Sequence, residues 1–400
     1  FCWGSPHVLQ SPRQRGLTDM AVRFLHSADW QIGKVFADLV AHDSDRAALL
    51  KIERVRAIER MARLATEHKL DCVVVAGDVF DSHTVADDVL RRTLNAMTGF
   101  AGPWLLLPGN HDAALGESVW TRLLRLPVPK NVIPMLTPEP VICADGRLAV
   151  LPAPLCRRHE SLDITEALDD MVTEAGAVRV GVAHGSVKNR LPERSEAVNE
   201  IAEDRAKRAR LDYLALGDWH GTLQIADKTY YAGTPEPDRF KDKDRSPSGN
   251  VLLCHIDGPG AAPQVETIPI GHFQWEKRAL SLQSAEDLAM LDALLGGLST
   301  SPERLVVDLT LSGSLPVSLD DPLRGLLADW QAKLHLLRVH DSGLLPEVND
   351  AELAGLPTEG LLRSVIADLR GKQAVGGELG GEARLALKLL LSEYRQAERG

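Results

Sequence analysis

Cys72-Val73-Val74-Val75-Ala76-Gly77-Asp78-Val79-Phe80-Asp81 joins a short apolar run directly to a glycine and two carboxylates. Such runs, rich in β-branched residues, predict strands, so the polar residues are expected just after a strand end. The same design recurs in Ala28-Asp29-Trp30-Gln31, Gly109-Asn110-His111-Asp112, Ala183-His184-Gly185 and Gly217-Asp218-Trp219-His220. The strands predicted before these segments cover residues 22–25, 72–76, 104–107, 180–183 and 213–216.

Helical patterns lie between the predicted strands, most clearly over residues 45–68. There Leu49, Ile52, Val55, Ala62 and Ala65 recur at helical spacing on one face. Strands that alternate with helices predict an α/β sandwich, in which the loops at one edge of a sheet converge. Carboxylates, one amide and several imidazoles gathered in this way are what a two-metal phosphoesterase site needs.

In this order the segments resemble the motifs of the calcineurin-like metallophosphoesterase superfamily, which run D-x-H, G-D-x-x-D, G-N-H-[DE], a lone His and G-H-x-H. The stretch from His26 to Lys34 and the segment Gly77-Asp78-Val79-Phe80-Asp81 are most similar to SbcD-like nuclease subunits. Tyr231-Ala232-Gly233-Thr234-Pro235, followed by Arg239-Phe240, resembles the end of that family's nuclease domain. The resemblance covers residues 24–240 and implies a two-sheet αββα sandwich.

The resemblance also implies two metal sites that share one carboxylate. The implied ligands are Asp29, Gln31 and His220 for the first ion, Asp78 for both ions, and Asn110, His184 and Asp218 for the second. His111 would be the catalytic residue that acts on the phosphate, by stabilising the transition state or protonating the leaving oxygen. Two divalent ions, manganese or alternatively magnesium, suit this set of oxygens and imidazoles.

Two of the implied ligands depart from the family pattern. Gln31 stands where the family has histidine, so a neutral amide replaces an imidazole. Asp218 stands where the first histidine of G-H-x-H is expected. Together the changes remove two nitrogen ligands and add a negative charge, which favours manganese or magnesium over zinc. A weakened enzyme is the alternative explanation of these departures.

Several neighbouring residues keep open roles. Asp29 or Asp78 alone could cap a helix or turn, although the joint order of the motifs favours ligands. His26 is expected to orient the ligands without binding the metals itself. Asp81 and His83 could contact the substrate or simply be solvated. Trp30 and Trp219 could stack on a nucleobase or form a wall of the metal pocket.

Composition limits the class of protein. A chain of 400 residues with 44% hydrophobic content can bury a large core, and no apolar run approaches the ~20 residues that span a bilayer. The five cysteines have no metal-type spacing, which indicates a reducing cytoplasm. Residues 1–19 are interpreted as a disordered extension or a misplaced start, because they have no apolar signal core and Met20 follows them.

The net charge of −11 argues against a general affinity for polyanions. Basic residues do cluster locally, and DNA binding would depend on such clusters or on a partner. The clusters contain Arg157 and Arg158; Lys188 and Arg190; Arg205, Lys207, Arg208 and Arg210; and Arg239, Lys241, Lys243 and Arg245. The cluster that begins at Arg205 reads as the solvated face of a helix, and the last cluster is nearly neutralised by interspersed aspartates.

The remaining chain divides into further predicted regions. We predict a phosphoesterase domain over residues 20–271, a small α/β capping domain over 272–345, and a helical region over 346–400 that docks an ATPase. Helices are expected at 284–295, 321–332, 359–370 and 382–395, with the glycine-rich residues 371–381 between the last two. By resemblance the final helix grips the coiled coil of an SbcC-like ATPase, whereas packing onto its own domain is the alternative.

These observations predict a metal-dependent DNA phosphodiesterase. The resemblance implies 3′-to-5′ exonuclease and endonuclease activity in DNA repair, a homodimer, and an SbcC-like partner that hydrolyses ATP. No G-x-x-x-x-G-K-[ST] segment occurs, so this chain is not expected to use ATP itself. The alternatives are a phosphoesterase acting on small nucleotides and a scaffold protein that organises the ATPase.

Overall fold

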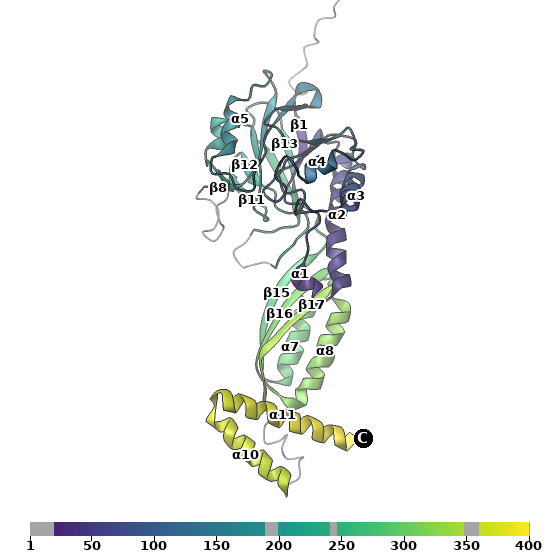
Figure 1. Ribbon diagram of the computed structural model, residues 1–400, viewed down its shortest axis with the longest axis vertical. Coiled ribbons are helices and arrows are strands. Elements are labelled where there is room, and N and C mark those ends of the chain that lie inside the picture. Colours follow the sequence, from purple (N-terminus) through teal and green to yellow (C-terminus); the bar gives the residue numbers. More distant parts are fainter. Residues whose placement is uncertain (1–19, 189–198, 241–245, 348–359, 400) are drawn as a thin grey trace, which may run out of the picture. The chain divides into compact units, whose positions relative to one another are not determined.

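The computed structural model describes residues 20–188, 199–240, 246–347 and 360–399 (Figure 1). The predicted extension over residues 1–19 lies outside these residues. The chain forms two compact units. The first comprises Phe1–Ala37, Ala48–Pro237 and Arg245–His272, and the second comprises Asp38–Ala47, Asp238–Asp244 and Phe273–Gly400.

Two six-stranded sheets make up the first unit. One sheet has the order β14-β13-β1-β2-β3-β4, and the other has the order β11-β12-β10-β7-β6-β5. The strands of the first sheet are β1 (Val22–Ser27), β2 (Cys72–Val75), β3 (Trp104–Leu106), β4 (Val132–Pro134), β13 (Asn250–Ile256) and β14 (Gln264–Pro269). Those of the second sheet are β5 (Val141–Cys143), β6 (Leu148–Ala153), β7 (Val178–His184), β10 (Tyr213–Gly217), β11 (Leu223–Ala226) and β12 (Thr229–Tyr231). A separate short pair consists of β8 (Ser186–Val187) and β9 (Glu200–Ile201).

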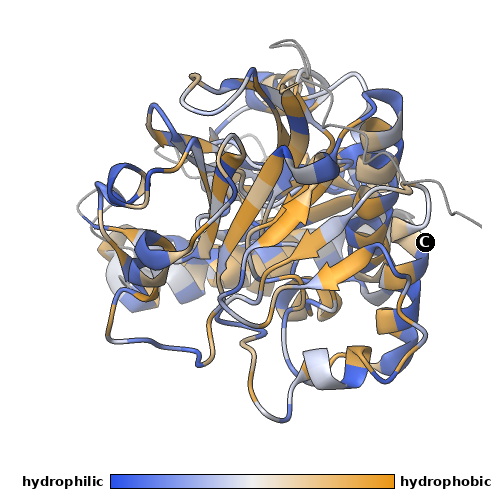
Figure 2. Ribbon diagram, turned by 90° about the horizontal axis from the view of Figure 1, so that it is seen from above, coloured by the Kyte–Doolittle hydropathy of each residue, from blue (hydrophilic) through white to orange (hydrophobic). Residues whose placement is uncertain are grey.

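Apolar side chains fill three layers of this unit. Between the sheets, Phe24, Val74, Val180 and Tyr213 belong to one buried cluster. Helices cover the outer faces, and in Figure 2 the strands at the centre are largely orange whereas the helices alternate between blue and orange residues. These helices are α2 (Ser44–Glu67), α3 (Asp87–Met97) and α4 (Val119–Leu123) beside the first sheet, and α5 (Ala167–Asp170) and α6 (Arg205–Arg208) beside the second. The predicted two-sheet αββα sandwich is confirmed.

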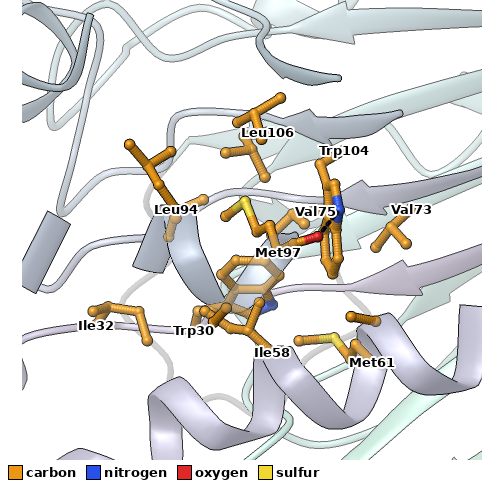
Figure 3. Close-up of a cluster of buried hydrophobic side chains, with 14 of the residues drawn as sticks. Trp30, Ile32, Ile58, Met61, Val73, Val75, Leu94, Met97, Trp104 and Leu106 are labelled. Carbon is orange, nitrogen blue, oxygen red and sulfur yellow. Dashed lines mark hydrogen bonds between the residues drawn. The ribbon is translucent and has the colours of Figure 1, made fainter. Parts of the chain in front are cut away.

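Helix α2 matches the predicted range of 45–68 to within a residue, but the predicted buried face is partly wrong. Leu50, Ile58 and Met61 are buried, whereas Leu49 and Ile52 are 44% and 40% exposed. The buried face is the one that packs on β1, β2 and β3, and Figure 3 shows Ile58 and Met61 beside Trp30 and Trp104. Helical periodicity alone did not separate the two apolar stripes, because both recur at similar spacing.

The second unit contains a parallel sheet of β15 (Gln274–Leu282), β16 (Leu305–Pro316) and β17 (Leu336–Glu347). Its crossover helices are α7 (Ala285–Gly296) and α8 (Asp320–Lys333), and α1 (Ala37–Val40) begins where the chain first passes from one unit to the other. A leucine-rich core joins the sheet to α7 and α8. Such strand, helix and strand units bury one sheet face, which agrees with the α/β character expected for this region.

Two more helices, α10 (Leu361–Val375) and α11 (Gly377–Arg399), end the described chain. The expectation that residues 371–381 separate them was wrong, because helix continues through Gly371, Gly380 and Gly381. The break is confined to Gly376 and Gly377, whose φ angles are 77° and 67°. Only glycine adopts such left-handed angles without steric cost, so this pair ends one helix and starts the next.

One face of α11 packs on its own unit. Leu387 and Leu391 are buried against Val317, while Leu385 and Leu389 are 54% and 57% exposed. The alternative of packing onto the chain's own domain therefore holds for one side of this helix, and the opposite side presents leucines to solvent. Within the described segments, no helix has both the length and the apolar character needed to cross a bilayer.

Candidate metal centre

The ends of five parallel strands deliver the polar residues to one edge of the sandwich. Asp29 follows β1, Asp78 follows β2, Asn110 follows β3, His184 ends β7 and Asp218 follows β10. Backbone bonds tie the first two loops together, since Gln31 N donates to Asp78 O at 2.8 Å. The two sheets are joined here as well, because Asp218 N donates to the Asp29 carboxylate at 3.1 Å.

The backbone is strained at this edge. Asp29, Gln31, Asp78 and Asp218 have φ angles of 52°, 42°, 52° and 101°, in a region that non-glycine residues rarely occupy. Strain of this kind costs on the order of 1–3 kcal/mol per residue and persists where the surrounding structure enforces it, typically at functional sites. At Gly109 a Cβ atom would lie 2.2 Å from Asp78 Oδ1, so only glycine allows this approach.

His184 gathers most of the candidate ligands around one ring nitrogen. Its Nδ1 donates to the Ala76 carbonyl at 2.9 Å, so Nε2 is the nitrogen that can bind an ion once it has lost its proton. Nε2 lies 3.0 Å from Asn110 Oδ1, 3.5 Å from Asp78 Oδ1 and 3.8 Å from Asp218 Oδ1. Two ligands that each lie about 2.1 Å from one ion are about 3.0–3.4 Å apart in octahedral or tetrahedral geometry, so this donor set fits a divalent cation.

Asp29, Asp78 and His184 also form a buried group whose ligand atoms all lie within 4.8 Å of one another. Burial alone would lower the pKa of His184, but the charges of Asp78, Asp29 and Asp218 outweigh it and raise the pKa to about 9. Burial raises the pKa of Asp29 to about 6. Without a cation, therefore, His184 holds a proton at neutral pH, and binding a cation must displace it.

Gln31 and His220, the other implied ligands of the first ion, contact each other instead. Gln31 Nε2 lies 3.2 Å from His220 Nε2. The carbonyl oxygen of Gln31 accepts a 2.7 Å bond from the ammonium of Lys34, a residue that sequence reasoning gave no role. These three side chains thus form a chain of polar contacts from Lys34 through Gln31 to His220.

His111 lies at the open side of the group. Its backbone N donates to Asp78 Oδ1 at 3.0 Å, and its ring Nδ1 donates to the Asp81 carbonyl at 3.0 Å. The ring Nε2 lies 4.0 Å from Asp78 Oδ2, and the side chain is 34% exposed. Asp81 therefore orients His111 through its backbone, while the ring remains accessible to a substrate.

The sequence of this edge matches a known family. A model of the calcineurin-like phosphoesterase family matches residues 22–222, just over half of the chain. The chain belongs to this family. Members use divalent metal ions in phosphoester hydrolysis, and the buried group around His184 is a possible site for such an ion.

Three relatives are each named as the SbcD component of the nuclease SbcCD. The Rhodobacter capsulatus protein is 33% identical over 98 residues, covering 23% of this chain and 22% of its own length. The Bacillus subtilis protein is 27% identical over 95 residues, with shares of 23% and 22%. The Escherichia coli K12 protein is 24% identical over 264 residues, with shares of 56% and 63%. The matches thus span less than two thirds of each relative.

The remaining predicted residues of this family member lie farther from the ligands. His26 is fully buried between Tyr213 Oη at 2.9 Å and the Leu216 carbonyl at 3.2 Å, and burial lowers its pKa to about 3. His83 lies against α4, where its Nδ1 accepts from Val119 N at 3.5 Å, and none of its described contacts reaches the ligand group.

The nucleobase-stacking hypothesis fails for Trp30 and stays untested for Trp219. Trp30 is 1% exposed, and its ring meets Trp104 edge-on at 6.0 Å inside the core (Figure 3). Stacking of Trp30 on a nucleobase is therefore wrong. Trp219 is half-buried and packs against the cluster on the outer face of the second sheet.

The expectation of a solvated basic helix was wrong at Arg205. This side chain is fully buried and pairs with Asp163 and Asp169, each at 2.8 Å. Arg157 and Arg158 are exposed and Lys188 is 61% exposed. Arg190, Lys241, Lys243 and Arg245 lie outside the described residues.

Three supporting residues escaped sequence reasoning. Arg54 on α2 is buried and donates to the carbonyls of Asp29 and Trp30 at 3.2 and 2.7 Å. Asp112 accepts from Phe80 N and Gly109 N, at 3.0 and 2.6 Å, and Ser186 Oγ donates to Asp218 Oδ2 at 2.8 Å. Asp112 ends the Gly109-Asn110-His111-Asp112 motif, so its position was a usable signal. The other two carried no sequence signal.

Proposed function

We propose that this protein is a metal-dependent phosphodiesterase that cuts DNA, with the 3′-to-5′ exonuclease and endonuclease activities of the SbcD type. The observation that carries the proposal is the placement of His111, held by Asp81 beside the ligands that converge on His184. The three relatives are named as part of a nuclease, which supports a nucleic acid as the substrate, and DNA is our proposal. A role in cytoplasmic DNA repair and a homodimeric state belong to the same proposal.

The bound cation, for which we propose manganese or alternatively magnesium, would supply charge to the phosphoryl oxygens and activate the attacking water. Asp78, Asn110, His184 and Asp218 would hold it, and the Ser186 hydroxyl fixes the second oxygen of Asp218. The Nδ1–H group of His111 donates a hydrogen bond to the backbone carbonyl of Asp81, so Nε2 is the ring nitrogen that would face the substrate. In the protonated form, Nε2 would donate a proton to the departing sugar oxygen.

The net charge of −11 favours one alternative, a phosphoesterase that acts on small nucleotides without holding a polymer. Hydrolysis of an end-labelled DNA duplex and of a small aryl phosphodiester, both with manganese, separates the two functions. We expect both substrates to be cut, and Asp78→Asn to abolish both reactions because it removes a ligand charge. Cleavage of the small diester with intact duplex and intact single strands would favour the alternative. If neither substrate were hydrolysed by a metal-loaded protein, the scaffold hypothesis would replace both.

The exposed side of α11 is the surface that we propose for the ATPase partner. Leu385 and Leu389 lie one helical turn apart, and Leu379 on the same helix is 48% exposed. A helix of an SbcC-like coiled coil could cover these leucines in the manner of a helix-in-groove contact. The partner would then bind the side of α11 opposite to the one that packs on Val317.

We expect the double change Leu385→Glu and Leu389→Glu to abolish co-purification with an SbcC-like ATPase. Stability should stay within about 0.5 kcal/mol, because both side chains are exposed. Affinity capture and thermal unfolding measure the two effects, and Leu162→Glu, at a leucine that is 78% exposed in the first unit, is the matched control. Undiminished capture of the ATPase by the double variant would rule out this face.

A further inference from the structure

Lys34 fixes the orientation of the Gln31 amide. The ammonium group of Lys34 can only donate hydrogen bonds, so the atom 2.7 Å away must be the amide oxygen. The amide nitrogen of Gln31 is then turned to His220, where it meets Nε2 at 3.2 Å. An amide N–H needs an acceptor, so the Nε2 lone pair of His220 receives it. Gln31 is 3% exposed, whereas Lys34 and His220 at the two ends are partly exposed.

This arrangement occupies both atoms that a first metal ion would need. The ion would require the carbonyl oxygen of Gln31 and the Nε2 lone pair of His220, but Lys34 and Gln31 already use them. Rotating the amide would turn its oxygen toward His220 and press its NH₂ group against the ammonium, so that two donors would face each other. The donor set of the first site therefore does not fit a second resident ion.

The charges lead to the same conclusion. Asp29, Asp78 and Asp218 bring three carboxylates to the centre, within reach of His184. One divalent cation offsets two of these charges, and the Lys34 ammonium places a further positive charge at Gln31, in the loop that also carries Asp29. A second divalent cation would have to bind beside this ammonium, and two positive charges at close range repel each other strongly in a partly buried site.

We propose that the protein holds one resident divalent ion, at the His184 group, and that Lys34 takes the place of the second ion. Gln31 and His220 position the ammonium, which contacts a phosphate oxygen of the substrate. This inference rests on the proposed phosphodiesterase function for its substrate contact, whereas the number of ions does not depend on it. Gln31 and Lys34 would thus together replace the histidine that the family pattern has at position 31 and the metal ion that this histidine would bind.

The stoichiometry of manganese in the full chain tests the inference. After equilibration with Mn²⁺ and gel filtration, we expect elemental analysis to find one equivalent of manganese per chain. The electron paramagnetic resonance spectrum should show the hyperfine splitting of isolated Mn²⁺. Lys34→Met frees the Gln31 oxygen, and Gln31→His restores an imidazole, so both variants should take up a second equivalent. Two ions about 3.5–4 Å apart would then give a spin-coupled spectrum. Lys130→Met, at an exposed lysine, is the control and should retain one equivalent.

Kinetics give a second readout. At one equivalent of metal, Lys34→Met should lower kcat for the small diester by about 100-fold, as loss of an oxyanion donor does, and excess manganese should restore part of it. Two tightly bound ions in the unchanged protein would overturn the inference, as would variants that stay at one equivalent. A protein with one ion that cuts neither substrate would instead overturn the proposed function and leave the stoichiometry intact.

Discussion

Replacement of His111 by alanine should leave the metal content unchanged and lower kcat by about 10²–10⁴-fold. The ring of His111 donates to the Asp81 carbonyl through Nδ1, and its Nε2 stays 4.0 Å from Asp78 Oδ2. This ring therefore lies beside the ligands without belonging to the group that converges on His184. In the proposed mechanism, its removal takes away the proton donor for the leaving oxygen and leaves the candidate ligands of the cation in place.

The measurement combines elemental analysis with steady-state kinetics on the small phosphodiester. His68→Ala is the matched control, because His68 is exposed at the end of α2, before β2 begins. Loss of bound metal in His111→Ala would show that His111 is a ligand and would contradict the assignment.

Arg54→Met should lower the free energy of unfolding by about 3–5 kcal/mol, because it leaves several buried acceptors without their donor. Arg54 is 2% exposed on α2 and donates to the Asp29, Trp30 and Glu236 carbonyls and to Thr234 Oγ1. Without the guanidinium, buried carbonyls lose donors at a cost of about 1–3 kcal/mol each. The loop that carries Asp29 would also lose its support, so metal affinity should fall together with stability.

Denaturant unfolding of the metal-free protein measures the stability change, and calorimetry measures the metal affinity. Arg63→Met lies on the same helix at an exposed position and should change stability by less than about 0.5 kcal/mol. Equal stability of the two variants would mean that water replaces the Arg54 bonds, and Arg54 would then not be a structural determinant of the site.

Much of the candidate centre could be predicted from the sequence because its residues follow strands. The apolar run before Asp78 and the one before Asp218 each predict a strand, and parallel strands release their next residues at a common edge. Asp29, Asp78, Asn110, His184 and Asp218 therefore come together as the order of the motifs indicates. The α/β sandwich follows from the same alternation of strands and helices.

Other features depend on contacts between segments that are distant in the chain. Arg54 is one of several charged residues on α2, and only the approach of the Asp29 loop and residues 234–236 makes it a buried support. Arg205 has the composition of a solvated helix, yet Asp163 and Asp169 enclose it. Side-chain burial depends on which surfaces meet, and periodicity within a single helix does not contain that information.

The sequence by itself determined the sandwich, the order of the candidate ligands and the position of His111, because each depends on local strand ends and short motifs. Only the tertiary structure decided how the departures at Gln31 and Asp218 are accommodated. Lys34 orients the Gln31 amide toward His220, and Ser186 holds Asp218. The physical reason is that a hydrogen bond has a direction and a donor, and the partner that fixes both can come from any part of the fold.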